Sequence, residues 1–419
     1  MKHPPHRKPP GRFRHLVVAA AVLLSVRGDA ADSPPPDPTG PYAKWPHGPS
    51  PDPSFYPVAV WLQSPARAAA YRAAGINTYV GLWRGPTEPQ LAELKSAGMK
   101  VICDQNEVGL AHRQDPTIIG WMHGDEPDNA QAQPGGNGYG PPIPPARIIE
   151  DYARIRAADP TRPVLLNLGQ GVAWDGWHGR GVRTHHPEDY PEYVKGGDLV
   201  SFDIYPACHS HPEVAGNLWY VAEGVKRLVT WGGNDRVTWN CIECTRISNP
   251  TTKATPEQVR AEVWMALIHG SRGIIYFVHE WQPRFNEAAL LADPPMLAEV
   301  TRINRRIAEL APVLNGPTLL DRVRVTTDDP AVPVAVMAKE HAGALYLFTV
   351  AMRDGSTVAT LKVPGQTGKE RVTVLGEDRE LMLQDGRLVD HFAPWQVHLY
   401  RLDAGRPVST DPDEPLESP

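Results

Sequence analysis

Two glutamates, Glu126 and Glu243, stand where apolar runs of the chain end. The segment 118–131 reads IIGWMHGDEPDNAQ, so an apolar run leads directly into Asp125 and Glu126. The run RVTWNCIE at 236–243 ends on Glu243. Hydrolysis of a glycosidic bond needs two carboxyl groups, one protonated to assist the leaving group and one ionised to attack or to activate water. We therefore take Glu126 and Glu243 as the candidate catalytic pair.

The elements that must position this pair are short apolar runs that alternate with helical patterns. Eight strand-and-helix units over about 260 residues are typical of a (β/α)8 barrel, whose parallel strands are buried on both faces. An open doubly wound sheet is the alternative, but VWLQSPAR after the first run lacks a glycine-rich phosphate turn. We predict a TIM barrel over 55–315, with strands at 56–62, 77–83, 100–106, 117–126, 163–169, 198–206, 236–243 and 273–280.

Other polar and aromatic residues also fall at the carboxyl ends of the expected strands, where the chemistry of this fold is located. Asp104 and Asp203 could orient substrate hydroxyls or satisfy loop amides, and His279 could bond a carboxylate or serve structure alone. The candidate substrate-binding residues are Trp61, Trp83, Asp104, Asp125, Asn167, Asp203, Tyr205, His279 and Trp281.

Two long loops follow the fourth and fifth strands. The second, at 169–194, carries four aromatic residues: Trp174, Trp177, Tyr190 and Tyr193. Aromatic rings pack against the C–H faces of sugars. These rings either line a sugar site or pin the loop.

Glutamates after strands four and seven of a barrel resemble the pattern of the clan A glycoside hydrolases, over roughly residues 55–312. The tract GWMHGDEPDN, with VSFDIYP, also resembles exported sugar-hydrolase-like proteins that carry a Trp…Asp-Glu-Pro segment. The clan A resemblance implies a retaining enzyme with Glu126 as acid/base and Glu243 as nucleophile. It further implies that Tyr205 bonds the nucleophile and that Trp281 floors the sugar site. The clan has Asn before its acid/base, whereas this chain has Asp125.

The expected function is hydrolysis of O-glycosidic bonds of an oligo- or polysaccharide, without a cofactor or a metal. A catalytically silent carbohydrate-binding barrel is one alternative. A metal-dependent hydrolase is another, because loop histidines stand at 185, 186, 209 and 211. Residue types do not determine four properties: the sugar, the linkage, endo or exo action, and the oligomeric state.

The first thirty residues have the layout of a secretory signal peptide. A basic segment precedes the apolar run at 16–26, and small residues surround Ala30. Removing 1–30 takes away six Lys/Arg and one Asp, which changes the net charge from −6 to −11. Such an acidic protein is not expected to bind nucleic acid or anionic lipid, and no later run predicts a membrane span. We expect a secreted or periplasmic protein.

Composition changes mark the remaining boundaries. Residues 31–54 form a linker or a surface arm, and nine prolines lie within 33–53. Short period-two runs after the last barrel helix predict an all-β sandwich domain at 316–404. The tail at 405–419 is rich in proline and acidic residues, as in disordered segments.

Four cysteines are present, at 103, 208, 241 and 244. The single C-x-x-C pair lies in an expected strand, where successive side chains point to opposite faces, so zinc is not expected there. Export permits disulfides. Cys208 with Cys244 is the preferred pair, and buried free thiols are the alternative.

Overall fold

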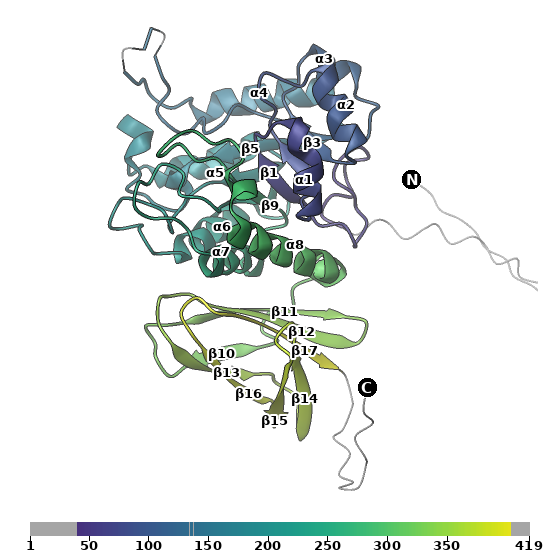
Figure 1. Cartoon of the computed structure of the whole chain (residues 1–419), viewed down its shortest axis with the longest axis vertical. Helices are drawn as coiled ribbons and strands as arrows, with labels where there is room; N and C mark the ends of the chain where they lie inside the picture. Colours follow the sequence, from purple (N-terminus) through teal and green to yellow (C-terminus); the bar gives the residue numbers. More distant parts are fainter. Residues whose placement is uncertain (1–39, 134, 137, 404–419) are drawn as a thin grey trace, which may run out of the picture. The chain divides into compact units, whose positions relative to one another are not determined.

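The computed structural model describes residues 40–133, 135, 136 and 138–403 (Figure 1). The expected signal peptide at 1–30 and the expected tail at 405–419 lie outside these residues. In the part of the chain that is described, no helix is long and apolar enough to cross a membrane.

The first part of the described chain is a nearly closed parallel barrel, which confirms the predicted fold class (Figure 1). The sheet order is β7-β6-β5-β4-β3-β2-β1-β9-β8. Strand β7 pairs with β6 and β8 pairs with β9, so these two short strands are consecutive sections of the seventh barrel strand. The strands are β1 (Val58–Trp61), β2 (Thr78–Val80), β3 (Lys100–Cys103), β4 (Ile118–Met122), β5 (Val164–Leu168), β6 (Leu199–Phe202), β7 (Val237–Thr238), β8 (Asn240–Glu243) and β9 (Ile274–Phe277).

Helices follow the strands, as the alternating sequence pattern predicts. Two of them begin with a capping box, in which Thr87 pairs with Gln90 and Thr255 pairs with Gln258. The α-helices are α1 (Ala68–Ala73), α2 (Glu88–Ser96), α3 (Glu107–Ala111), α4 (Pro145–Ala158), α5 (Tyr190–Tyr193), α6 (Trp219–Gly232), α7 (Pro256–Ile268) and α8 (Pro294–Leu314). Short 3-10 helices are η1 (Pro65–Arg67), η2 (Gln170–Val172), η3 (His178–Arg183), η4 (Pro187–Asp189), η5 (Val194–Gly196) and η6 (Ala289–Ala292).

The inside of the barrel is a packed apolar core. It contains one or two buried side chains from each barrel strand, among them Val80, Leu165 and Ile275. Two aromatic residues of the proline-rich stretch, Tyr42 and Trp45, belong to the same cluster. The Tyr42 hydroxyl accepts a hydrogen bond from the indole of Trp239 at 2.9 Å and donates one to the carbonyl of Arg272 at 2.7 Å. This stretch therefore contributes to the core, which its composition alone did not indicate.

The second part of the described chain is a separate antiparallel β domain. Its sheet has the order β10-β13-β16-β15-β14-β17-β12-β11 and encloses its own apolar cluster, which includes Leu347, Leu361 and Tyr400. The strands are β10 (Arg324–Thr327), β11 (Val334–His341), β12 (Ala344–Ala351), β13 (Thr357–Lys362), β14 (Lys369–Val374), β15 (Arg379–Gln384), β16 (Arg387–Phe392) and β17 (Val397–Asp403).

All four cysteines are buried free thiols. The preferred disulfide between Cys208 and Cys244 is therefore wrong. The Cys244 thiol instead donates to the carbonyl of Phe277 at 3.3 Å. Among the described residues there is also no group of three or more His, Cys, Asp or Glu side chains arranged to hold a metal ion.

Candidate functional site

The end of β4 carries an unusual backbone conformation. Its strand residues are apolar and mostly buried, and the chain then passes through Gly124 and Asp125 to Glu126. Glu126 has φ 43°, in the left-handed region that residues other than glycine rarely adopt. Non-glycine residues in sparsely populated backbone regions cluster at functional sites. The turn brings Glu126 against Gly169 at the end of β5, where an added Cβ would lie 2.9 Å from Oε1 of Glu126.

Glu126 forms a coupled carboxyl pair with Asp203, which follows β6. Burial raises the pKa of Glu126 well above its usual range, and the negative charge of the neighbouring Asp203 raises it further. Burial also raises the pKa of Asp203 to about 7, and the neighbouring side chains of Glu126 and Tyr205 oppose that shift. Two neighbouring buried carboxyl groups resist simultaneous ionisation. The pair therefore holds a proton near neutral pH.

Asp125 occupies a different environment, although it is adjacent in sequence. Solvent reaches its side chain, yet protein surrounds it closely enough that burial raises its pKa to about 6. The side-chain amide of Asn167 donates to Oδ1 of Asp125 at 2.9 Å and opposes this shift. Asn167 is oriented in turn by the Ser201 hydroxyl, which donates to its Oδ1 at 2.7 Å. Asp125 is thus ionised above about pH 6, while the neighbouring pair still carries a proton.

A buried network ties the loop after β4 to the loop after β5. Asp128 is fully buried, and it accepts hydrogen bonds from the amide of Gly169 at 2.9 Å and from the hydroxyl of Tyr190 at 2.8 Å. The indole of Trp177 donates to Oδ1 of Asn129 at 2.7 Å. Sequence reasoning did not assign Asp128 or Gly169 to the site. The carboxylate-rich segment after β4 and the glycine directly after β5 were the available signals.

Glu243, the second member of the expected pair, lies in a closed environment. Its side chain has no exposed surface. Oε1 accepts the amide of Ala207 at 2.6 Å, and Oε2 accepts the amide of Cys208 at 2.9 Å. Its other partner is Glu262 on α7, a buried carboxyl group with which it is coupled. The structure therefore surrounds Glu243 with the loop after β6 and with α7, and no side of its carboxyl group faces solvent.

Burial raises the pKa of Glu243 to about 7, and the hydrogen bonds from Cys208 and Ala207 oppose that shift. Burial likewise raises the pKa of Glu262 well above its usual range, and the charge of Glu243 adds to the effect. Neither oxygen of Glu262 has a hydrogen-bond partner among the described residues. Sequence reasoning missed Glu262, which lies in the apolar helix segment AEVWMALI.

A row of three aromatic side chains begins at Tyr205, which neighbours Asp203. The ring of Tyr205 lies 5.1 Å from that of Phe277, and Phe277 stacks on Trp281 with centroids 5.6 Å apart. Trp281 is 43 % exposed. His279 is buried, its Nε2 lies 3.2 Å from the side-chain nitrogen of Gln63, and burial lowers its pKa. Tyr205 interacts with Asp203, whereas the clan A resemblance implied a bond to the residue in the position of Glu243.

The remaining candidates lie apart from this cluster of interactions. Trp61 is buried in the apolar interior of the barrel, whereas Trp83 is 67 % exposed and stacks under the guanidinium of Arg84. Asp104 follows β3, and burial alone raises its pKa. The structure thus brings together five of the predicted residues: Asp125, Glu126, Asn167, Asp203 and Tyr205. Glu243, Trp61 and Trp83 lie in different environments.

Solved glycoside hydrolases share the fold of this chain. An Anoxybacillus α-amylase has a TM-score of 0.51 at 11 % identity, covering 84 % of this chain and 98 % of its own. An α-amylase from Geobacillus thermoleovorans, crystallised with acarbose, has a TM-score of 0.50 at 12 % identity, covering 83 % and 98 %. A β-galactosidase from G. stearothermophilus gives 0.50 at 9 % identity, again covering 83 % and 98 %. These likenesses show the fold, and no protein-family model or curated protein matches the sequence.

Proposed function

We propose that this protein hydrolyses O-glycosidic bonds with Glu126 as the proton donor. The observation that carries the proposal is the arrangement of Glu126, held by a left-handed turn after β4, beside Asp203 after β6, where burial raises the pKa of both carboxyl groups. A leaving sugar hydroxyl is a poor leaving group unless it is protonated as the bond breaks. A carboxyl group with a raised pKa supplies that proton at the pH where an ordinary glutamate is ionised.

Asp203 acts in this proposal through its effect on Glu126. Its negative charge favours the protonated form of Glu126, because two carboxyl groups in contact resist simultaneous ionisation. Tyr205 opposes the rise in the pKa of Asp203, so it stabilises the charge that Asp203 carries after Glu126 has donated its proton. Asp203 is therefore a positioning residue that tunes the acid.

Asp125 is the ionised partner in the proposal. It is accessible to solvent, and Asn167 holds one of its oxygens in place. The pKa of Asp125, about 6, is lower than that of Asp203, about 7. We propose the retaining route, in which Asp125 attacks the anomeric carbon and Glu126 then acts as base on water. The clan A resemblance places the attacking carboxylate at Glu243, so this assignment departs from it. The anomeric form of the first product, followed by NMR, tests this stereochemistry.

Glu243 has a supporting role in this account. A carboxylate that accepts two backbone amides and has no exposed surface cannot approach an anomeric carbon without giving up those bonds. The same two bonds fix the loop after β6, which carries Asp203 and Tyr205. We propose that Glu243 holds this loop so that Asp203 meets Glu126.

The substrate class follows from the surroundings of the acid. The aromatic side chains of Tyr205, Phe277 and Trp281 form a row beside it, with a large exposed face on Trp281. Such faces bind the apolar surfaces of sugar rings. We propose an oligo- or polysaccharide substrate.

The test is a screen of purified protein against aryl glycosides and against plant, algal and bacterial polysaccharides, with product analysis. The proposal predicts turnover of at least one class, and loss of that turnover in Glu126→Gln. Turnover that Glu126→Gln leaves unchanged would refute the assignment of the acid, and binding without turnover across the whole screen would favour the silent carbohydrate-binding barrel.

We also propose that the protein is exported, on the basis of the basic and then apolar sequence at 1–30. Mass spectrometry of the mature protein from its native host should find a start near Ala31. An intact N-terminus at Met1 or Lys2 would contradict export by this route.

A further inference from the structure

Two residues beyond Glu126, the chain carries a carboxyl group that the proposed chemistry does not use. Asp128 has no exposed surface. Its Oδ1 accepts the backbone amide of Gly169 at 2.9 Å, and its Oδ2 accepts the hydroxyl of Tyr190 at 2.8 Å. Gly169 directly follows β5, and Tyr190 begins α5. Because buried hydrogen bonds are costly to break, this one side chain joins the turn after β4 to two points of the loop after β5.

The end of β5 bears directly on the two carboxyl groups of the proposed acid. A Cβ added at Gly169 would lie 2.9 Å from Oε1 of Glu126, so the Glu126 side chain rests against this glycine. One residue earlier, the carbonyl of Leu168 accepts the backbone amide of Asp203 at 3.0 Å. A displacement between the turn after β4 and this strand end would therefore move Glu126 relative to Asp203.

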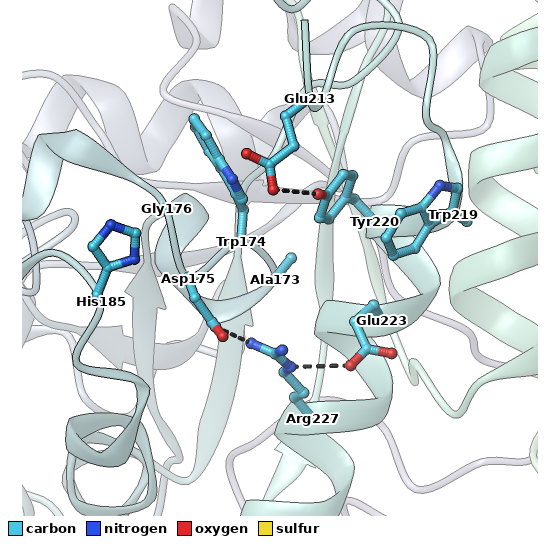
Figure 2. A pocket seen from close by; sticks show the side chains of 10 residues that line it. All are labelled: Ala173, Trp174, Asp175, Gly176, His185, Glu213, Trp219, Tyr220, Glu223 and Arg227. Atoms are coloured by element: carbon cyan, nitrogen blue, oxygen red, sulfur yellow. Dashed lines mark hydrogen bonds and ion pairs between the residues drawn. The ribbon is translucent and has the colours of Figure 1, made fainter. Parts of the chain in front are cut away.

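The loop that Asp128 engages is itself held to the barrel. Figure 2 shows Arg227 of α6 between two carboxylates, with Nη1 2.7 Å from Oδ1 of Asp175 in this loop and Nε 3.0 Å from Oε1 of Glu223. The same guanidinium donates to the carbonyl of Val172 at 3.3 Å. A contact positions a catalytic group only if its own support is fixed. The loop after β5 meets that condition.

Asp128 also acts on the site through its charge. Its negative charge raises the pKa of Asp125, of Glu126 and of Asp203. Like charges in a poorly solvated site favour the protonated forms of one another. One buried charge thus acts on all three carboxyl groups.

Arg180 favours the ionised form of Asp128. It is 1 % exposed, its guanidinium lies over the ring of Tyr190, and its Nε donates to the carbonyl of Asp128 at 3.4 Å. Burial raises the pKa of Asp128, and the bonds from Gly169 and Tyr190 and the charge of Arg180 oppose that rise. Asp189 pairs with Arg180 at 2.7 Å. The other titratable groups around Asp128 are Asp125, Glu126, Tyr193 and Asp203.

We propose that Asp128 is a positioning residue for the acid: it anchors the turn that carries Glu126 to the end of β5 and supplies a fixed negative charge beside the carboxyl groups of the site. Asp128 is fully buried, so it acts through Glu126 and not on the substrate. The role rests on the proposed function of Glu126, but it is measured first without turnover. Absence of turnover in the wild type would reject the proposed hydrolysis, and the titration of Glu126 would still decide the role of Asp128.

The first test is an NMR titration of protein labelled with ¹³C at the side-chain carboxyl groups of glutamate. The signal of Glu126 is assigned by its loss in Glu126→Gln. Asp128→Asn keeps the shape of the side chain and an oxygen for the amide of Gly169, and it removes the charge. The pKa of Glu126 should therefore be lower in Asp128→Asn than in the wild type. An unchanged pKa of Glu126 would overturn the proposal.

The second test is the pH profile of kcat/KM. Asp128→Asn should move both limbs to lower pH, because the charge of Asp128 raises the pKa of Asp125 as well as that of Glu126. At the new optimum kcat should fall roughly 10- to 100-fold with little change in KM, because a displaced acid fails in the chemical step.

Tyr190→Phe separates the anchor from the charge. It removes one of the two bonds to Asp128 and keeps the negative charge, so it should lower kcat by a smaller factor and leave both limbs in place. A kcat that is unchanged in both Asp128→Asn and Tyr190→Phe would overturn the anchoring role.

Asp198→Asn is the matched control. Asp198 is also buried, and it accepts the backbone amide of Val164 at 3.1 Å and the hydroxyl of Tyr152 at 2.7 Å. It directly precedes β6, and Val164 is the first residue of β5, so this tie lies at the amino end of the barrel. Asp198→Asn should leave the pKa of Glu126 and both limbs where they are. An equal shift in Asp198→Asn and Asp128→Asn would trace the effect to a loosened barrel and overturn the proposal.

Discussion

Among the described residues, two pairs of neighbouring carboxyl groups differ in what surrounds them. Glu126 and Asp203 lie at strand ends and remain partly accessible to solvent. Glu243 and Glu262 are completely enclosed between the seventh barrel strand, the loop after β6 and α7. Burial raises the pKa of all four groups. A raised pKa therefore does not by itself identify a catalytic acid in this chain, and accessibility makes the distinction.

The hydrogen-bond partners differ in the same sense. Both oxygens of Glu243 are occupied by backbone amides at 2.6 and 2.9 Å. Oδ1 of Asp203 is buried and has no hydrogen-bond partner among the described residues, although Glu126 and Tyr205 are its neighbours. Backbone amides thus occupy Glu243, whereas in the described part of the chain an oxygen of Asp203 stays free of partners; the oxygens of Glu262 also lack partners, but they are enclosed away from solvent.

The largest effect is expected from removing the acid of the accessible pair. Glu126→Ala should lower kcat/KM for glycosides with poor leaving groups by roughly 10²- to 10⁴-fold, because no proton reaches the leaving oxygen. Dinitrophenyl glycosides, which leave without protonation, should lose far less in the first step. Steady-state kinetics across a series of aryl leaving groups measures this, and equal loss for all of them would contradict the role as acid.

The next effect concerns the pH profile. Asp203→Asn removes the charge that helps to hold the proton on Glu126, so the pKa of Glu126 should fall and the alkaline limb of kcat/KM should move to lower pH. The acid limb, which we assign to Asp125 with its pKa of about 6, should stay in place.

Asp104→Asn serves as the control for this shift. Asp104 also follows a barrel strand, and burial raises its pKa, but it is not among the groups that shift Glu126. Its substitution should leave the alkaline limb where it is. An alkaline limb that is the same in Asp203→Asn as in the wild type would show that the two carboxyl groups are not coupled in solution.

The sequence predicted the accessible carboxyl pair better than the enclosed one. Apolar runs and helix caps located all eight barrel positions, because burial on both faces leaves a continuous signal. Asp125, Glu126, Asn167 and Asp203 could be collected because strand ends meet at one edge of a barrel. The enclosed position of Glu243 could not be predicted from the sequence. It depends on the path of the loop after β6, whose backbone amides donate to Glu243.

The enclosed pair should affect stability more than catalysis. Its raised pKa values mean that the folded state keeps protons which the unfolded state releases above about pH 4.5, so the free energy of unfolding falls as pH rises toward about 7. Glu262→Gln stays neutral in both states. Between pH 5 and pH 8 the free energy of unfolding, measured by urea denaturation, should therefore fall less in Glu262→Gln than in the wild type, by about 1–3 kcal/mol.

Glu257→Gln is the control for this measurement, since Glu257 is exposed in the first turn of the same helix. It should show the same pH dependence as the wild type. An unchanged decline in Glu262→Gln would mean that the enclosed pair does not hold the extra proton.

The central claim is that catalysis depends on the accessible pair, and a direct comparison of Glu126→Gln with Glu243→Gln tests it. Both variants replace a carboxyl group by an amide, and kcat/KM is measured on one unactivated substrate at low temperature, normalised to the folded fraction from circular dichroism. We predict a loss of roughly 10²- to 10⁴-fold for Glu126→Gln and of less than about tenfold for Glu243→Gln, which weakens the hold on one loop. Folded Glu243→Gln without turnover, beside an active Glu126→Gln, would contradict the account.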